Sequence, residues 1–224
     1  MDYFPFNIGL NGSIPDQWGT TFFNSQVNFN VLPYFSGDKD FAKAAAANGY
    51  PANQHANYVT LQLGADRVQT IYHDWSVKLH ADGQWANGPL FSNEQYAMGG
   101  TAGVRGYLDG LDYGDTGWRV AFEPQTPLIN IGMVGNEGHE ETCWLRGSVF
   151  MDYGELYRFD DTPGLPANLT TLHTLHFWGT GLGLTANIGT HLDARLTVAW
   201  PLFEPAAGAA LGPVHIHFGV GAQF

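Results

Sequence analysis

Residues 214–224 read VHIHFGVGAQF, and their side chains alternate between two kinds. Successive side chains of a β-strand point to opposite faces, so the segment predicts a strand with one apolar face and one wet face. The apolar face carries Val214, Ile216, Phe218, Val220, Ala222 and Phe224. The opposite face carries His215, His217, Gly219, Gly221 and Gln223.

The same period of two recurs at 192–200, 145–154, 75–82 and 23–31. A soluble sandwich also alternates, but its water-facing side usually carries many Lys, Glu and Thr. Here the second face holds Asn, Gln, Gly, His and occasional opposite charges, while aromatic residues gather near the strand ends. An apolar outside around a wet inside is typical of a membrane barrel. We therefore predict an all-β, antiparallel transmembrane β-barrel. A soluble β-sandwich is the alternative fold.

About nine strands are expected, joined alternately by short and long connections, as in outer-membrane barrels. The short connections are 14–19, 70–75, 136–141 and 187–191. The long ones are 36–57, 86–116 and 160–170. The strands are expected at 4–12, 20–33, 58–69, 74–85, 117–127, 142–157, 171–187, 190–201 and 214–224.

Composition excludes several functions. The formal charge is −12, with 21 acidic against 9 basic residues, so no nucleic-acid partner is expected, because little in the chain would neutralise phosphates. The single cysteine, Cys143, cannot form an internal disulfide and is interpreted as an apolar filler. No apolar run approaches the ~20 residues of a membrane helix. The first residues carry no basic segment leading into an apolar core, so no secretory signal is expected.

The stretch GGTAGVRGYLDGLDYGDTGW, residues 99–118, places seven glycines around one arginine, Arg105. A phosphate-binding loop would need a lysine at the P-loop position, or a G-x-G-x-x-G arrangement leading into a helix. Neither pattern is present, and a strand is expected to follow. Glycine permits positive φ angles and close backbone approach. The stretch is therefore interpreted as a loop folded into a confined space, rather than one exposed to solvent.

Residues 98–127 resemble the signature of the two-partner secretion transporters, the haemolysin secretion/activation proteins. Their wider superfamily includes the barrel-assembly insertases. The family pattern is GG-x-x-S-V-R-G-[YF], then G-D-x-G, then a strand with Glu and Pro. Gly103 replaces the usual serine. The matching residues are Gly99, Gly100, Val104, Arg105, Gly106, Tyr107, Gly114, Asp115, Gly117, Glu123 and Pro127.

The resemblance covers roughly residues 90–224. The segment 149–159 resembles the F-x-D-x-G strand of the family, 195–202 its penultimate strand and 217–224 its C-terminal strand. Phe218 and Phe224 then fit the signal that the barrel-assembly machinery reads. Five strands follow the loop, as in the sixteen-stranded barrel of the family, but only about four precede it. Residues 1–224 are therefore expected to be the C-terminal part of the barrel, without the periplasmic POTRA domains.

The resemblance also implies a loop–lumen latch. In this family the V-R-G-[YF] loop folds back into the lumen, and its arginine pairs with the aspartate of F-x-D-x-G, which is Asp152 here. The alternation independently places Asp152 on the inward face, because it shares parity with Arg146 and Ser148. Glu123 is a second candidate partner for Arg105.

Other candidate sites carry weaker patterns. His215 and His217 share one face, and His173 and His176 lie one strand region away. Two histidines at i and i+2 on a strand can chelate a metal, but no cysteine or carboxylate joins them at metal-site spacing. They are interpreted as polar lining of the lumen. No metal and no cofactor are expected, and no nucleophile motif or catalytic Ser/His/Asp pattern indicates an enzyme.

The resemblance implies a pore in the outer membrane of a Gram-negative bacterium. The pore would export, and in some cases activate, a secreted partner protein such as a haemolysin or an adhesin. Its other expected contacts are outer-membrane lipid and the barrel-assembly machinery. An insertase of the same superfamily is the first alternative. A passive porin or a surface enzyme on a similar barrel is the second.

Overall fold

The computed structural model describes residues 5–30, 58–135, 140–159, 174–189, 191–205, 212 and 214–223. No helix long and apolar enough to cross a membrane occurs in these ranges. Every regular element described is a β-strand, which confirms the all-β prediction. The long strands are β1 (Pro5–Asp16), β2 (Gly19–Asn30), β3 (Val59–Thr70), β4 (Ser76–Ala86), β7 (Thr116–Gln125), β9 (Glu141–Tyr157), β10 (Leu175–Ile188), β11 (Leu192–Pro201) and β12 (His215–Ala222). The short strands are β5 (Tyr96–Met98), β6 (Asp112–Gly114) and β8 (Ile129–Val134).

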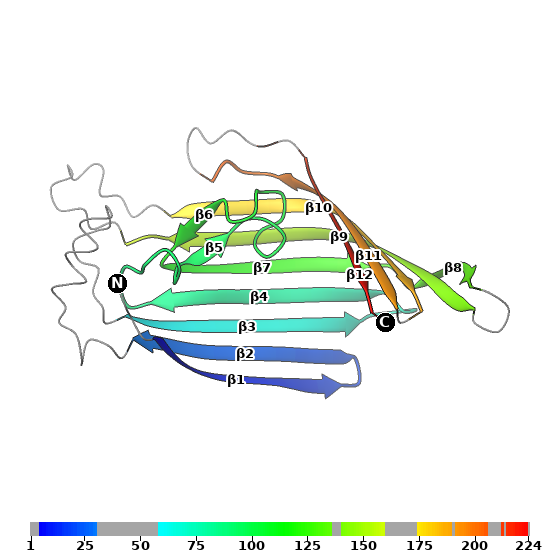
Figure 1. The fold of residues 1–224 in the computed structure, drawn as a ribbon, viewed down its shortest axis with the longest axis horizontal. Helices are drawn as coiled ribbons and strands as arrows, with labels where there is room; N and C mark the ends of the chain where they lie inside the picture. The colour runs from blue at the N-terminus through cyan, green and yellow to red at the C-terminus, as the bar shows by residue number, and fades with distance from the viewer. Residues whose placement is uncertain are drawn as a thin grey trace.

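The nine long strands form one antiparallel sheet in the order β1-β2-β3-β4-β7-β9-β10-β11-β12. Each long strand pairs with the next long strand in the sequence, as expected when strands follow one another as hairpins. β1 and β12 are the two edges of the described sheet. The sheet is strongly curved: β1 to β4, β7 and β9 run across Figure 1, whereas β11 and β12 cross them steeply. The number of long strands agrees with the prediction.

The alternation seen in the sequence separates two faces of this sheet. Register pairs such as Lys78 with Glu123, and Asp82 with Arg119, place charged side chains together on the inner face. The outer face exposes large apolar side chains: Ile8, Leu10, Leu63, Leu79, Val120, Phe122, Val149, Met151, Leu182, Leu184, Ile216, Phe218 and Val220. Burial of such a surface in hydrocarbon is favourable by about 25 cal/mol per Å². The expected apolar exterior is therefore confirmed.

Aromatic side chains of the outer face gather near the two ends of the strands. At the end where β4 and β7 meet the long loop, neighbouring rings contact one another: Trp118 and Tyr153 have centroids 5.6 Å apart, and Tyr153 and Trp178 6.1 Å. Trp18, Tyr72 and Trp75 lie exposed at the opposite end, beside the short turns. Aromatic rings at both rims fit the two membrane–water interfaces of a barrel.

Three boundaries differ from those expected. The segment 14–19 was expected to be a turn, but β1 continues through Pro15 to Asp16, because its register with β2 holds up to a two-residue turn at 17–18. The chain beyond residue 127 resumes as β8, which pairs with β9 through a bulge at Asn130–Gly132. The alternation of apolar and polar residues is interrupted at 126–128, so the sequence did not predict this further strand. The long loop 86–116 contains the hairpin β5–β6.

Part of the prediction falls outside the described residues. This applies to the loops 36–57 and 160–170, to Phe224, and to the outer ends of the strands expected at 20–33 and 171–187. The short connection expected at 136–141 is described only at its last two residues, 140 and 141.

Candidate functional site

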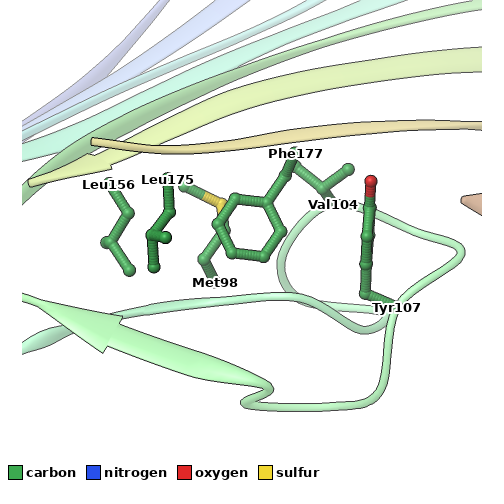
Figure 2. Close-up of a cluster of buried hydrophobic side chains, with 6 residues drawn as sticks. All are labelled: Met98, Val104, Tyr107, Leu156, Leu175 and Phe177. Carbon is green, nitrogen blue, oxygen red and sulfur yellow. The ribbon is translucent and has the colours of Figure 1, made fainter. Parts of the chain in front are cut away.

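The loop between β4 and β7 folds back across the inner face of the sheet, with β5 and β6 lying in front of β7 and β9 in Figure 1. Figure 2 shows how three loop side chains, Met98, Val104 and Tyr107, meet three side chains of β9 and β10. All six residues are buried; the wall contributes Leu156, Leu175 and Phe177. The loop is therefore docked through an apolar cluster of its own.

Two features of the glycines explain how the loop reaches the wall. Gly99, Gly100 and Gly106 have φ angles of 100°, 86° and 102°, a region that strains other residues. A Cβ on Gly106 would also lie 2.7 Å from the carbonyl carbon of Trp200. The backbone of the loop thus both turns and touches the wall at positions where a side chain would interfere.

Glycines on the wall make matching space for the loop. A Cβ on Gly179 of β10 would lie only 1.7 Å from the carbonyl oxygen of Arg105. A Cβ on Gly154 of β9 would lie 2.9 Å from Cε of Met98, and one on Gly117 of β7 would lie 2.7 Å from the ring of Tyr96. Loop and wall therefore approach each other more closely than ordinary side chains allow.

Arg105 is bound to two carboxylates of the inner wall. Its Nε and Nη2 donate to the two oxygens of Asp152, each over 2.7 Å, and its backbone N–H donates to Asp152 Oδ2 over 3.0 Å. Its Nη1 donates to Glu123 Oε2 over 2.6 Å. The guanidinium carbon lies 3.5 Å from the ring centroid of Phe150. Arg105 thus joins the loop to β7 and β9 through a bidentate pair, a second carboxylate and a cation–π contact.

Burial makes this arrangement sensitive to the loss of a partner. The side chains of Arg105 and Glu123 are each 17% exposed, and that of Asp152 is 2% exposed. Burial alone would lower the pKa of Arg105, but the hydrogen bonds and charges of Asp152 and Glu123 outweigh it and raise that pKa. Arg105 therefore stays charged. Removal of one partner from a buried ion pair typically costs ~3–5 kcal/mol, because the other charge is left uncompensated.

Tyr107 fixes the loop at a second position. Its hydroxyl shares its one proton between the carbonyl oxygens of Phe203, 2.8 Å away, and Trp178, 3.1 Å away, and accepts from the backbone N–H of Trp178 over 3.0 Å. Its ring packs edge-on against Phe177, with centroids 5.2 Å apart. Burial raises the pKa of Tyr107, so the hydroxyl keeps the proton that it donates.

Asp115 of the G-D-x-G segment holds the start of the loop to the end of β9. It is 2% exposed. Its Oδ1 accepts from the backbone N–H of Leu90 over 2.7 Å and from Gln95 Nε2 over 3.1 Å, and its Oδ2 accepts from the N–H of Phe159 over 2.8 Å. Gly114 beside it leaves room for Leu156, whose Cγ would lie 2.6 Å from a Cβ. The motif is therefore a structural junction.

Replacing Asp115 with alanine is expected to destabilise the loop end of the sheet by about 3 kcal/mol or more, since hydrogen bonds to a charged group contribute ~1.5–3 kcal/mol each. Heat unfolding of the full-length protein in detergent, followed by its shifted migration on an SDS gel, measures the change. Asp109 is the control, because it accepts from Thr101 N–H at an exposed position. Equal unfolding temperatures for the Asp115→Ala and Asp109→Ala variants would contradict this role.

The remaining sequence-predicted residues lie apart from the latch. Phe218 is 72% exposed on the outer face of β12. His215 and His217 stack on the inner face, with ring centroids 6.5 Å apart, whereas His176 lies on the outer face beside Tyr153. His173 is outside the described residues, and within those residues no three His, Cys, Asp or Glu side chains are grouped as a metal site would require.

Sequence reasoning missed several residues that hold the loop. Tyr96, Asp82 and Arg119 form a second polar cluster against it, and the wall glycines Gly154 and Gly179 admit it. A signal for the cluster was present, because Asp82 shares inward parity with Lys78 and His80 in the alternating strand. No pattern in the sequence indicates the role of Gly179, because that role depends on the loop backbone that packs against it in the fold.

A curved antiparallel sheet with an apolar outer face, aromatic rims and a loop docked on its polar inner face is typical of the wall of an outer-membrane β-barrel. The family model described as haemolysin secretion/activation protein ShlB/FhaC/HecB matches residues 3–184. The chain therefore belongs to this family of two-partner secretion transporters, which are located in the outer membrane of Gram-negative bacteria and pair with secreted partner proteins.

Known relatives agree with this membership. The outer membrane transporter CdiB of Escherichia coli is 26% identical over 200 residues, which cover 89% of this chain and 30% of the relative. CdiB of Escherichia coli O6:K15:H31 (strain 536 / UPEC) gives the same values. The solved structure of CdiB from Escherichia coli matches with a TM-score of 0.72 at 20% identity, over 99% of this chain and 37% of that one. The chain thus spans about a third of the length of these relatives.

Proposed function

We propose that the chain forms part of a pore that exports a specific secreted partner protein, such as a haemolysin or an adhesin, across the outer membrane. The loop with the V-R-G-Y sequence would gate this pore. The partner would pass unfolded through the lumen without ATP, and displacement of the loop would open the route. Arg105, bound to Asp152 and Glu123, would act as the latch.

The single observation that supports gating is the bidentate Arg105–Asp152 pair, which holds a glycine-rich loop against the inner wall. A loop stabilised by a few directional bonds can occupy two discrete positions, docked and displaced, and a partner that binds the displaced form shifts the balance between them. Membership of a transporter family makes a translocating chain the natural partner.

Two further contacts belong to the proposal. Outer-membrane lipid would cover the apolar outer face, which includes Leu63, Val120 and Ile216. The barrel-assembly machinery would recognise β12, on which Phe218 points outward, together with Phe224. Neither contact requires a cofactor.

The proposal is tested by deleting the gene and measuring the partner protein in the culture medium and in the periplasm. A secretion pore predicts loss of the partner from the medium and its return when the full-length gene is restored. Lower levels of unrelated outer-membrane barrels after deletion would instead indicate an insertase. Steady, ungated conductance of the purified protein would indicate a passive porin. Either of these results, with unchanged partner export, would overturn the proposal.

A further inference from the structure

Beside the Arg105 latch, a second polar cluster joins the same loop to different strands. Asp82 of β4 and Arg119 of β7 are register partners on the inner face, and the Arg119 Nε donates to Asp82 Oδ1. The side chains are 23% and 16% exposed, respectively. The pair lies one inward position nearer the loop end of the strands than the row of Ala121 and Asp152, because Arg119 is opposite Gly154.

Both members of this pair also contact the loop. The Nη1 of Arg119 donates to the carbonyl oxygen of Gly103 over 2.6 Å, two residues before Arg105. The hydroxyl of Tyr96, on β5, donates to Asp82 Oδ2. A charged donor therefore holds the backbone at the middle of the loop, and a charged acceptor holds a side chain on its first strand.

A third strand supports the cluster from behind. The ring of His80 lies between two carboxylates, with Nδ1 2.6 Å from Asp66 Oδ1 on β3 and Nε2 2.5 Å from Asp82 Oδ1. Asp82 is thus held by neighbours on β4 and β7 while it accepts from the loop. The cluster therefore has partners on β3, β4 and β7 as well as on the loop.

We propose that Arg119 and Asp82 form a second attachment of the gating loop, separate from the pair of Arg105 with Asp152. The two attachments use different carboxylates, Asp82 and Glu123/Asp152, although their arginines, Arg119 and Arg105, line one cavity of about 690 Å³ on the inner face. Arg119 and Asp82 are positioning residues: they hold the Tyr96–Gly103 half of the loop, and the latch holds the loop at Arg105. The attachment itself is inferred from these contacts alone. Only its consequence, that an opening stimulus must break both attachments, rests on the proposed gating role.

Independent attachments have a measurable signature. Free energies of independent sites add, so the effects of breaking each attachment on the docked–displaced ratio should multiply. Val104, a loop residue that is fully buried against the wall, serves as the reporter when replaced by cysteine in a Cys143→Ser full-length protein. Cysteine behaves as a small apolar residue in such a position, and its rate of modification by a maleimide measures how often the loop is displaced.

In this background, Arg119→Gln is expected to raise the modification rate several-fold, and Tyr96→Phe, which removes only the hydroxyl, to raise it less. The Arg119→Gln and Arg105→Gln changes together should give the product of the two separate increases. The matched control is Arg195→Gln, an inward arginine of β11 for which no hydrogen bond is found among the described residues; it should leave the rate unchanged.

Unchanged rates in both Arg119→Gln and Tyr96→Phe would overturn the second attachment. An equal increase in Arg195→Gln would also overturn it, because the effect would then reflect general loss of charge from the inner face. Labelling needs no partner protein. Increased labelling with normal partner export would therefore support the attachment while contradicting the gating role, so the two failures are distinguishable.

Discussion

Replacing Asp152 with alanine is expected to lower export of the partner protein by about tenfold or more, while the full-length protein still reaches the outer membrane. The change removes both acceptors of the bidentate pair and leaves Arg105 buried, with only Glu123 as a charged neighbour. Loss of one partner costs ~3–5 kcal/mol, and each 1.4 kcal/mol is about tenfold in an equilibrium. The docked position of the loop would then lose its advantage. Because the proposed gate works by moving between the docked and displaced positions, a loop without a defined docked position should lower export. The amount of partner in the medium, relative to the amount of transporter in the outer membrane, measures the effect.

The Glu123→Gln variant is compared with Asp152→Ala and should show a weaker loss of export. Glu123 accepts one hydrogen bond from Arg105, whereas Asp152 accepts three, including one from the backbone, so the effect of Glu123→Gln should be smaller. Arg105→Ala should match or exceed Asp152→Ala, since it removes the cation itself. Normal export from both Arg105→Ala and Asp152→Ala would end the latch hypothesis.

A single methyl group on Gly179 is expected to displace the loop without touching any charge. The new Cβ of Gly179→Ala would lie 1.7 Å from the Arg105 carbonyl oxygen, and the obstacle is backbone rather than a side chain that could swing away. Overpacking of this kind costs typically ~1–3 kcal/mol, and a contact so short should lie at the upper end. Maleimide modification of Val104→Cys should consequently accelerate by about tenfold or more.

The control for this steric effect is Gly219→Ala. Gly219 also faces inward, on β12, but a Cβ there meets no atom within 4 Å. Its variant should label at the parental rate. If Gly179→Ala and Gly219→Ala behave alike, the close approach of loop and wall is not what holds the loop in place.

The strands could be predicted because each carries its own signal. A face made of Val149 and Met151, opposed by Ser148 and Asp152, is visible in a few residues and needs no knowledge of distant segments. The ends of strands were less predictable, because a residue that usually marks a turn can also lie within a strand. Proline is uncommon inside strands, yet β1 runs through Pro15 to Asp16, and the interrupted alternation at 126–128 gave no sign of β8.

The candidate site was only partly predictable. Parity placed Asp152 on the inner face, and the family resemblance supplied Arg105 as its partner; the structure brings the two together with Glu123. The cluster of Asp82 with Arg119 and Tyr96 was missed, because pairing across strands depends on register, which alternation leaves open by steps of two. The wall glycines could not be assigned from sequence, since Gly179 matters only through the carbonyl that faces it.

The central claim is that the loop rests docked in the lumen, and relative accessibility of two loop positions tests it most directly. Val104 is fully buried, whereas Leu108, four residues later, is 59% exposed. In full-length Cys143→Ser protein in outer membranes, we expect Leu108→Cys to react quickly with a maleimide and Val104→Cys to react at least about tenfold more slowly, given docking worth 1.4 kcal/mol or more. Equal rates at the two positions would show that the loop is not held against the wall, and would contradict the account.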